Sequence, residues 1–141
     1  MSILRIAPAV FPLHIPVIQT LITTYVSAIR ADIGFQDVQA ELATLPGPYA
    51  PPRGLLLLAW QGDTGAPPLA CVAYRRLGDE PTCEMKRFYV SPAARGHGVG
   101  RELVQALLSA ARAAGYRRMV LDVLPEFEAA RRLYAQTGLW A

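Results

Sequence analysis

This 141-residue chain has few cysteines, almost no lysine and no very long apolar run, and each shortage excludes a class of protein. Its two cysteines, Cys71 and Cys83, fall in different predicted strands, and nothing in their spacing indicates a metal site. No apolar run reaches the roughly 20 residues of a membrane-spanning helix. The N-terminus also lacks the basic segment and long apolar stretch of a signal peptide. We therefore expect a cytoplasmic protein without a metal ion or a membrane partner.

Lys86 is the only lysine among the 14 basic side chains, and the formal net charge is +3. A mildly basic surface of this kind suits either nucleic acid or a cofactor that carries several phosphate groups. The chain has no basic run and no interleaving of basic with aromatic residues. We therefore rank nucleic acid low among the candidate partners.

Apolar residues are abundant, at 52% of the chain, and their periodicity predicts one α/β domain spanning residues 1–141. Alternating or continuous apolar runs predict strands at residues 2–7, 54–61, 69–77, 82–90 and 119–123. Helical spacing predicts helices at residues 14–34, 35–45, 100–114 and 125–138. Short turns between strands indicate an antiparallel meander, and residues 82–123 form a right-handed β-α-β arrangement. The expected sheet is mixed and mostly antiparallel, with helices on both faces.

Three local patterns in the N-terminal half lead to specific expectations. On the second predicted helix, Asp37 and Glu41 should point outward. Residues 46–52, Pro-Gly-Pro-Tyr-Ala-Pro-Pro, cannot form regular structure and should be either a plain surface linker or a lid beside a site. Residues 54–61 are almost wholly apolar, which predicts a strand covered on both faces.

A glycine-rich turn from Arg95 to Arg101 follows the strand at 82–90 and precedes a strong helical pattern. Such a turn can aim several backbone N–H groups at one point, and the helix N-terminus adds about half a positive charge, so a phosphate site is indicated. A P-loop is excluded because Arg101-Glu102 follows Gly100. The dinucleotide fingerprint is excluded because its last glycine would fall at Arg101. A glycine-rich turn without a ligand is the alternative.

Three blocks in order resemble the GNAT superfamily, the N-acetyltransferases that use acetyl-coenzyme A. They are the strand Cys83–Pro92, the Arg-x-x-Gly-x-Gly turn from Arg95 to Gly100, and Ala130–Leu139, which is similar to the family's Ala-x-x-Leu-Tyr-x-x-x-Gly-Phe signature. The resemblance implies a GNAT-like fold from about residue 2 to residue 140. It also implies that pantetheine pairs with the exposed edge of a strand, as added peptide strands do. The residues implied in acetyl-CoA binding are Phe88, Tyr89, Val90, Arg95, Gly96, His97, Gly98, Val99 and Gly100.

The strand at 82–90 contains a conflict of periodicity. With regular alternation, Glu84, Lys86, Phe88 and Val90 would share one face and mix polar with apolar side chains. A β-bulge near Arg87 would resolve the conflict, and bulges commonly lie beside functional sites.

Acetyl transfer to an amine needs a base, an acid and an oxyanion donor. An amine with a pKa near ~10.4 is mostly protonated at neutral pH and must lose a proton before it attacks. The resemblance implies that Glu84 is the base, Tyr134 the acid for the leaving thiolate, and the Val90 N–H the oxyanion donor. A strand interior would also raise the pKa of Glu84 by burial. The structural alternatives are a surface Glu84 paired with Lys86 or Arg87, and a Tyr134 that only packs in the core.

The chain also departs from the family pattern. The usual asparagine after the strand at 119–123 is missing, Leu139 replaces phenylalanine, and the final C-terminal hairpin is apparently absent. An uncovered sheet edge promotes association. Either a second copy covers that side in a homodimer, or the chain is truncated and less active.

These observations predict an acetyl-CoA-dependent N-acetyltransferase that acts by direct attack in a ternary complex. The acceptor would be a small-molecule or peptide amine of unknown identity. The main alternative is a non-catalytic module that binds or senses acyl-CoA, which the missing hairpin favours. A basic surface-binding protein without a cofactor is a weaker third hypothesis.

Overall fold

The helices and strands follow the predicted order along the chain. A computed structural model describes residues 4–28, 40–62, 66–78, 81–94, 96 and 98–121. The strands are β1 (Leu4–Pro8), β2 (Leu55–Gln61), β3 (Ala70–Arg76), β4 (Thr82–Val90) and β5 (Arg118–Leu121). The helical elements are α1 (Ile15–Ala28), α3 (Val99–Ala113) and the short 3₁₀ turns η1 (Gly47–Tyr49) and η2 (Pro92–Ala94). Of the predicted helix at 35–45, residues 40–43 are helical and 35–39 lie outside the described residues, as does the helix predicted at 125–138.

Within the described part of the chain, the strands form one sheet in the order β1-β2-β3-β4-β5. The first four strands are antiparallel neighbours, as the short turns predicted. β5 runs parallel to β4, with Thr82 opposite Arg118 and Met85 opposite Leu121. α3 connects these two strands, so the predicted β-α-β arrangement and the mixed, mostly antiparallel sheet are confirmed.

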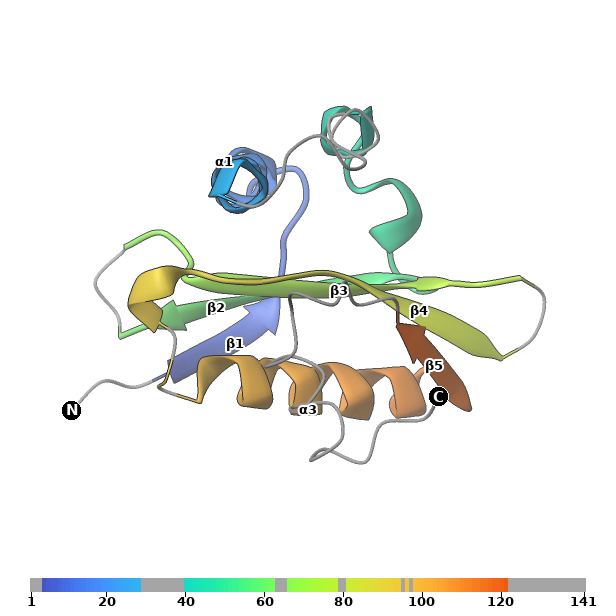
Figure 1. Cartoon of the computed structure of the whole chain (residues 1–141). Helices are drawn as coiled ribbons and strands as arrows, with labels where there is room; N and C mark the ends of the chain where they lie inside the picture. The colour runs from blue at the N-terminus through green and yellow to red at the C-terminus, as the bar shows by residue number, and fades with distance from the viewer. Residues whose placement is uncertain are drawn as a thin grey trace.

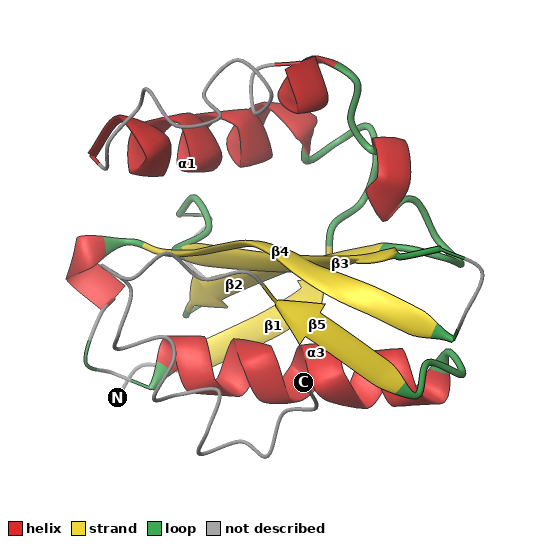
Figure 2. Cartoon of the chain, turned by 45° about the vertical axis from the view of Figure 1, so that its right-hand side comes forward, coloured by secondary structure: helices red, strands yellow, loops and turns green. Residues whose placement is uncertain are grey.

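Helices cover both faces of the sheet (Figure 1), and an apolar core lies on each side of it. α1 and η1 lie over one face and α3 lies over the other, which Figure 2 shows from a second direction. Alternate residues of β2 point into the two cores, so its predicted double burial is confirmed. We call the first core the α1 layer: Ile18, Ile22, Leu42, Leu45, Tyr49, Leu56, Leu58, Cys71 and Ala73. The α3 layer is centred on Leu57, Ala59, Val72, Met85, Leu103, Leu107 and Met119.

α3 buries an apolar stripe that differs slightly from the predicted one. Val99, Leu103 and Leu107 are buried as expected, whereas Ala114 is exposed. The rest of the buried stripe consists of Val104, Leu108 and Ala111. The helix ends at the predicted glycine, since Gly115 has a φ of +98° directly after the C-cap residue. None of the described helices is long and apolar enough to cross a membrane.

The proline-rich segment at 46–52 is more ordered than its composition predicted. It contains η1, and the Tyr49 side chain is 0% exposed in the α1 layer. Close approach makes this possible, because Gly54 has no side chain where the backbone of Tyr49 passes over the start of β2. The expectation of wholly irregular surface structure was therefore wrong: the prolines on either side of Tyr49 are exposed, but the tyrosine anchors the segment to the core.

Candidate functional site

β4 contains the predicted β-bulge, centred on Arg87. Between Lys86 and Tyr89, β4 has two residues where β3 has one, Val72. Arg87 has a φ of +56°, and among the described residues it is the non-glycine residue with positive φ. The left-handed region costs an L-residue about 1–2 kcal/mol. Such a conformation persists only where surrounding contacts hold it, and it is typical of functional sites.

The bulge separates the side chains that a regular strand would have mixed. Phe88 and Val90 pack against the α3 layer, and Tyr89 packs against the α1 layer. Glu84 and Lys86 precede the bulge and alternate with residues buried in the α3 layer, so they lie on the α1 side of the sheet. The predicted conflict of periodicity is thus resolved by one extra residue.

The bulge also changes which edge of β4 its main-chain groups face. The Thr82 carbonyl faces β3 and accepts an N–H at 2.9 Å, and the Ser91 N–H also faces β3, where it donates at 2.8 Å. Positions 82 and 91 differ by an odd number, so in a regular strand these groups would face opposite edges. Main-chain groups of successive strand residues face alternate edges, and the Ser91 N–H faces β3. The N–H groups of Val90 and Phe88, one and three residues before Ser91, therefore point toward the β5 edge. Two of the three residues expected to contact pantetheine therefore direct their main chain to that edge.

The glycine turn begins just beyond this strand. Gly96 and Gly98 have φ values of +84° and +79°, both are exposed, and a Cβ added to either would meet nothing within 4 Å. Gly98 is the N-cap of α3, and its carbonyl accepts the Glu102 N–H at 3.1 Å. Within the described part of the chain, no hydrogen bond occupies the N–H groups of Gly96 and Gly98. The turn has the open backbone that a phosphate site requires, next to the N-terminus of α3.

Glu84 lies on the α1 side, opposite Arg75 of β3 and beside Val120 of β5 in the pairing register. Its side chain is partly exposed, so the interior position expected for it was wrong. Among the described residues no ion pair joins it to Lys86 or Arg87, the partners that a purely structural role would give it. Its role as a base stays a prediction.

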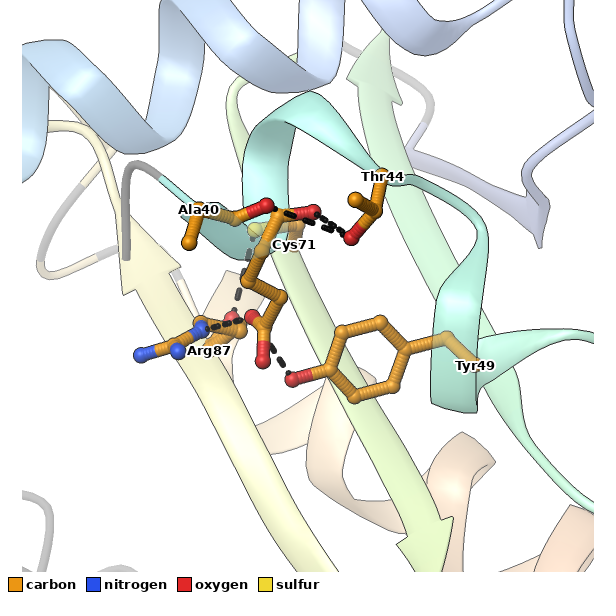
Figure 3. A network of polar contacts seen from close by, with 6 residues as sticks. Ala40, Thr44, Tyr49, Cys71 and Arg87 are labelled. Atoms are coloured by element: carbon orange, nitrogen blue, oxygen red, sulfur yellow. Dashed lines mark hydrogen bonds and ion pairs between the residues drawn. The ribbon is translucent and has the colours of Figure 1, made fainter. Parts of the chain in front are cut away.

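Sequence reasoning missed the partners of Arg87. Arg87 Nε donates to Glu41 Oε2 at 2.5 Å, and the Tyr49 hydroxyl donates to the same oxygen at 2.9 Å. Glu41 was expected to point outward, but its side chain is 15% exposed and that of Arg87 is 14% exposed. The Cys71 thiol donates to the Arg87 carbonyl at 3.3 Å. Figure 3 shows how Tyr49, Arg87 and Cys71 converge from different elements.

Burial and charge shift the pKa values around this cluster. Burial is the largest single influence on Arg87 and opposes its charge, but the hydrogen bond to Glu41 together with the charge interactions of Tyr49, Glu41 and Tyr89 outweighs burial, and the pKa of Arg87 is raised. The pKa of Tyr49 is raised, first by burial and then by the carboxylate of Glu41. Burial raises the pKa of Cys71 to about 12. The pKa of Tyr89 is also raised by burial, while Arg87 opposes the shift. At neutral pH the cluster is one ion pair among neutral hydroxyl and thiol groups.

Three predicted site residues, Arg95, His97 and Tyr134, lie outside the described residues. Their roles stay predictions. Val99 is buried at the start of α3 and Gly100 is partly exposed beside it, so the described part of the turn leads directly into the helix. The described residues contain no group of three or more histidine, cysteine, aspartate or glutamate side chains arranged to hold a metal ion.

Comparison with known proteins gives one consistent result. The family model described as the acetyltransferase (GNAT) family matches residues 23–139. An uncharacterised N-acetyltransferase of Schizosaccharomyces pombe is 36% identical over 137 residues, which cover 97% of this chain and 83% of that protein.

Solved structures share the fold at low identity. A GNAT-family acetyltransferase of Staphylococcus aureus Mu50 superposes with a TM-score of 0.80 at 16% identity, over 96% of this chain and 84% of that one. AAC(6')-Iy, solved in complex with the bisubstrate analogue CoA-S-monomethyl-acetylneamine, superposes with a TM-score of 0.68 at 15% identity, over 99% and 92% of the two chains. Both likenesses concern the arrangement of helices and strands.

Proposed function

The chain belongs to the acetyltransferase (GNAT) family, and from this premise we propose that it transfers the acetyl group of acetyl-CoA to an amine by direct attack in a ternary complex. Acetyl transfer follows from the family, which also favours an enzyme over a non-catalytic acyl-CoA sensor. The observation that supports the finer proposal is the position of the β4 bulge directly before the open glycine turn. The bulge turns the Phe88 and Val90 N–H groups toward the β5 edge, and the turn that follows contains the exposed glycines Gly96 and Gly98.

The described residues fit acetyl-CoA. The donor carries a diphosphate, and the turn around Gly96 and Gly98 has exposed backbone, room beside both glycines and the N-terminus of α3 next to it. The donor's pantetheine arm contains amides, and the main-chain groups of Phe88 and Val90 face the edge of β4 along which such amides would pair. Arg95 and His97 belong to the same turn, and we propose that their main chains also hold the diphosphate.

Three groups of this chain would then act on the reacting atoms. Glu84 would take a proton from the acceptor amine, directly or through a water molecule. The Val90 N–H would donate to the carbonyl oxygen on which negative charge develops. Tyr134 would give its proton to the departing sulfur. Each step is a proton transfer or a hydrogen bond at a stated atom.

The acceptor would bind on the α1 side of the sheet, where Glu84 lies. We propose a small-molecule or peptide amine, a class consistent with the acetylneamine analogue bound to AAC(6')-Iy. Homodimer formation and a cytoplasmic location stay predictions.

The test is release of free thiol from acetyl-CoA in the presence of a broad panel of primary amines, with mass spectrometry of the products. We expect a thiol signal that requires both acetyl-CoA and an amine, and an amine product whose mass has risen by the difference between an acetyl group and the hydrogen that it replaces. Glu84→Gln serves as the low-activity control. Failure to release thiol with every amine, at a protein concentration that binds CoA, would count against the proposal.

A further inference from the structure

Arg87 is held at both its side chain and its main chain. Glu41 accepts from its guanidinium at 2.5 Å, Tyr49 donates to the same carboxylate oxygen at 2.9 Å, and Cys71 donates to its carbonyl at 3.3 Å. The residue they hold is the one described non-glycine residue in the left-handed region. Two hydrogen bonds therefore reach the strained residue of the bulge itself, and a third, from Tyr49, holds the carboxylate that accepts one of them.

The partners of Arg87 are themselves fixed. Glu41 lies in the helical residues 40–43, which α1 holds through the Gln19 side chain, whose amide donates to the Leu42 carbonyl at 2.9 Å. Tyr49 is 0% exposed in the α1 layer. The carboxylate is thus positioned by packed elements 46 residues away from Arg87 in the sequence.

We propose that Glu41 and Tyr49 are positioning residues, which hold Arg87 in its left-handed conformation and so keep the Phe88 and Val90 N–H groups directed at the acetyl-CoA path. We call Glu41, Tyr49 and Arg87 the bulge clamp. This proposal rests on the proposed function only in taking acetyl-CoA as the ligand of those N–H groups. Glu41 and Tyr49 would then affect acetyl-CoA binding through the conformation of Arg87, without touching the donor.

A purely structural ion pair would behave differently. If Arg87 served stability alone, alanine and glycine in its place would change the free energy of unfolding but would leave the KM for acetyl-CoA alike. If it serves to hold a positive φ, glycine should preserve the bulge, since glycine adopts that conformation without a steric penalty. The ranking of the two variants therefore separates the two roles.

The experiment measures the KM for acetyl-CoA in Glu41→Gln, Tyr49→Phe, Arg87→Ala and Arg87→Gly proteins. Arg87→Ala and Glu41→Gln should raise this KM about ten-fold, the factor that corresponds to about 1.4 kcal/mol. Arg87→Gly should stay within about three-fold of the wild type, because its backbone keeps the bulge. The double variant Glu41→Gln/Arg87→Gly should match Arg87→Gly alone, because the clamp is already absent there.

Two matched controls remove equivalent contacts elsewhere. Arg76→Ala removes an arginine that bonds the Gly78 carbonyl at the far end of β3, and Tyr116→Phe removes a hydroxyl that bonds the Arg53 carbonyl. Both should leave the KM for acetyl-CoA unchanged. Equal effects of glycine and alanine at position 87, or an unchanged KM in Glu41→Gln, would overturn the proposal.

A second readout does not depend on turnover. In ¹⁵N-labelled protein without acetyl-CoA, the amide resonances of Phe88 and Val90 should move in Glu41→Gln and Arg87→Ala, and lie near their wild-type positions in Arg87→Gly. Unmoved amides in all variants would refute the clamp even if the protein released no thiol. Wild-type protein that fails to release thiol while its variants show the expected amide pattern would refute the proposed function and leave the clamp supported.

Discussion

Replacing Gly54 with alanine should be among the most damaging single-methyl changes in this chain. Gly54 does not have a positive φ, so its backbone conformation suits alanine and only contacts decide the outcome. An ideal Cβ there would lie 2.5 Å from the Tyr49 Cα and 2.7 Å from its carbonyl carbon, and it would also strike the Pro48 carbonyl oxygen. These are main-chain atoms, so no side-chain rotation relieves the overlap.

The cost can be worked out from these distances. Ordinary contact begins at 3.4 Å, so η1 must move by about 0.9 Å to clear the Tyr49 Cα, and by more to clear the Pro48 carbonyl oxygen, which lies nearer. Overpacking of a fitted core costs about 1–3 kcal/mol. The movement also strains the hydrogen bond from Tyr49 to the Glu41 carboxylate, a type worth about 1.5–3 kcal/mol. The free energy of unfolding should therefore fall by about 3–5 kcal/mol, and Tm by roughly 10–15 °C.

The assay is urea unfolding followed by far-UV circular dichroism, with Gly78→Ala as the control. Gly78 has a φ of +69° and nothing within 4 Å of an added Cβ. Alanine at this position would be strained in its backbone but would clash with no neighbour, so it should lower the free energy of unfolding by about 1–2 kcal/mol. In a Tyr49→Phe background, Gly54→Ala should cost less, because the hydroxyl bond is already absent. A loss below about 1 kcal/mol for Gly54→Ala would show that η1 does not rest on β2 as described.

Three further predictions concern the donor site, the base and the buried thiols. Gly98→Val should weaken CoA binding by about ten-fold or more in calorimetry, because a branched side chain at positive φ strains the turn and fills its open side. Gly115→Val, which is strained in the same way at the other end of α3, should leave CoA affinity unchanged. Equal losses of CoA affinity in the two variants would argue against a phosphate turn. Glu84→Gln should lower kcat by roughly 10²–10⁴-fold with little change in the KM for acetyl-CoA, and an unaltered kcat would remove this residue from the mechanism. Burial raises the pKa of Cys71 to about 12 and that of Cys83 to about 11, above the ordinary 9.0, so the folded state holds these protons more tightly. The resulting stability is complete below pH 9 and is lost as pH rises toward the folded-state pKa values, by up to about 1.4 kcal/mol per pH unit for each thiol. Urea unfolding at pH 8 and pH 10 measures this loss. Cys71→Ala should make the free energy of unfolding less dependent on pH, and an equal pH dependence in that variant would contradict the role given to the Cys71 thiol.

Local patterns predicted most of the described fold. β4 was predicted with the observed bounds, because a turn sequence ending at Pro81 precedes the run and Ser91-Pro92 ends it. The bulge was predictable because regular alternation along this strand would have placed Glu84 on the same face as Phe88. A conflict within one strand is visible in the sequence, and one extra residue is its simplest physical solution.

The bulge clamp could not be predicted in the same way. Periodicity assigns Glu41 to the polar face of a helix, and only the position of Arg87, 46 residues later, turns that face into a contact. Tyr49 was missed because proline and glycine indicate the absence of regular structure and say nothing of burial. The available signal was an aromatic residue within a proline-rich run shortly before Gly54, a spacing that close backbone packing requires.

Because β2 and β3 each supply side chains to both cores, alternate residues of each strand must face alternate cores along its whole length. One residue inserted in the middle of β2, before Leu58, would turn Leu58 toward α3 and Ala59 toward α1. The core of the α3 layer would then be overpacked, and the α1 layer would contain a cavity. Relatives of this chain should therefore differ in length between β2 and β3 and between β3 and β4, and insertions within the central strands should occur in pairs or be absorbed by a further bulge.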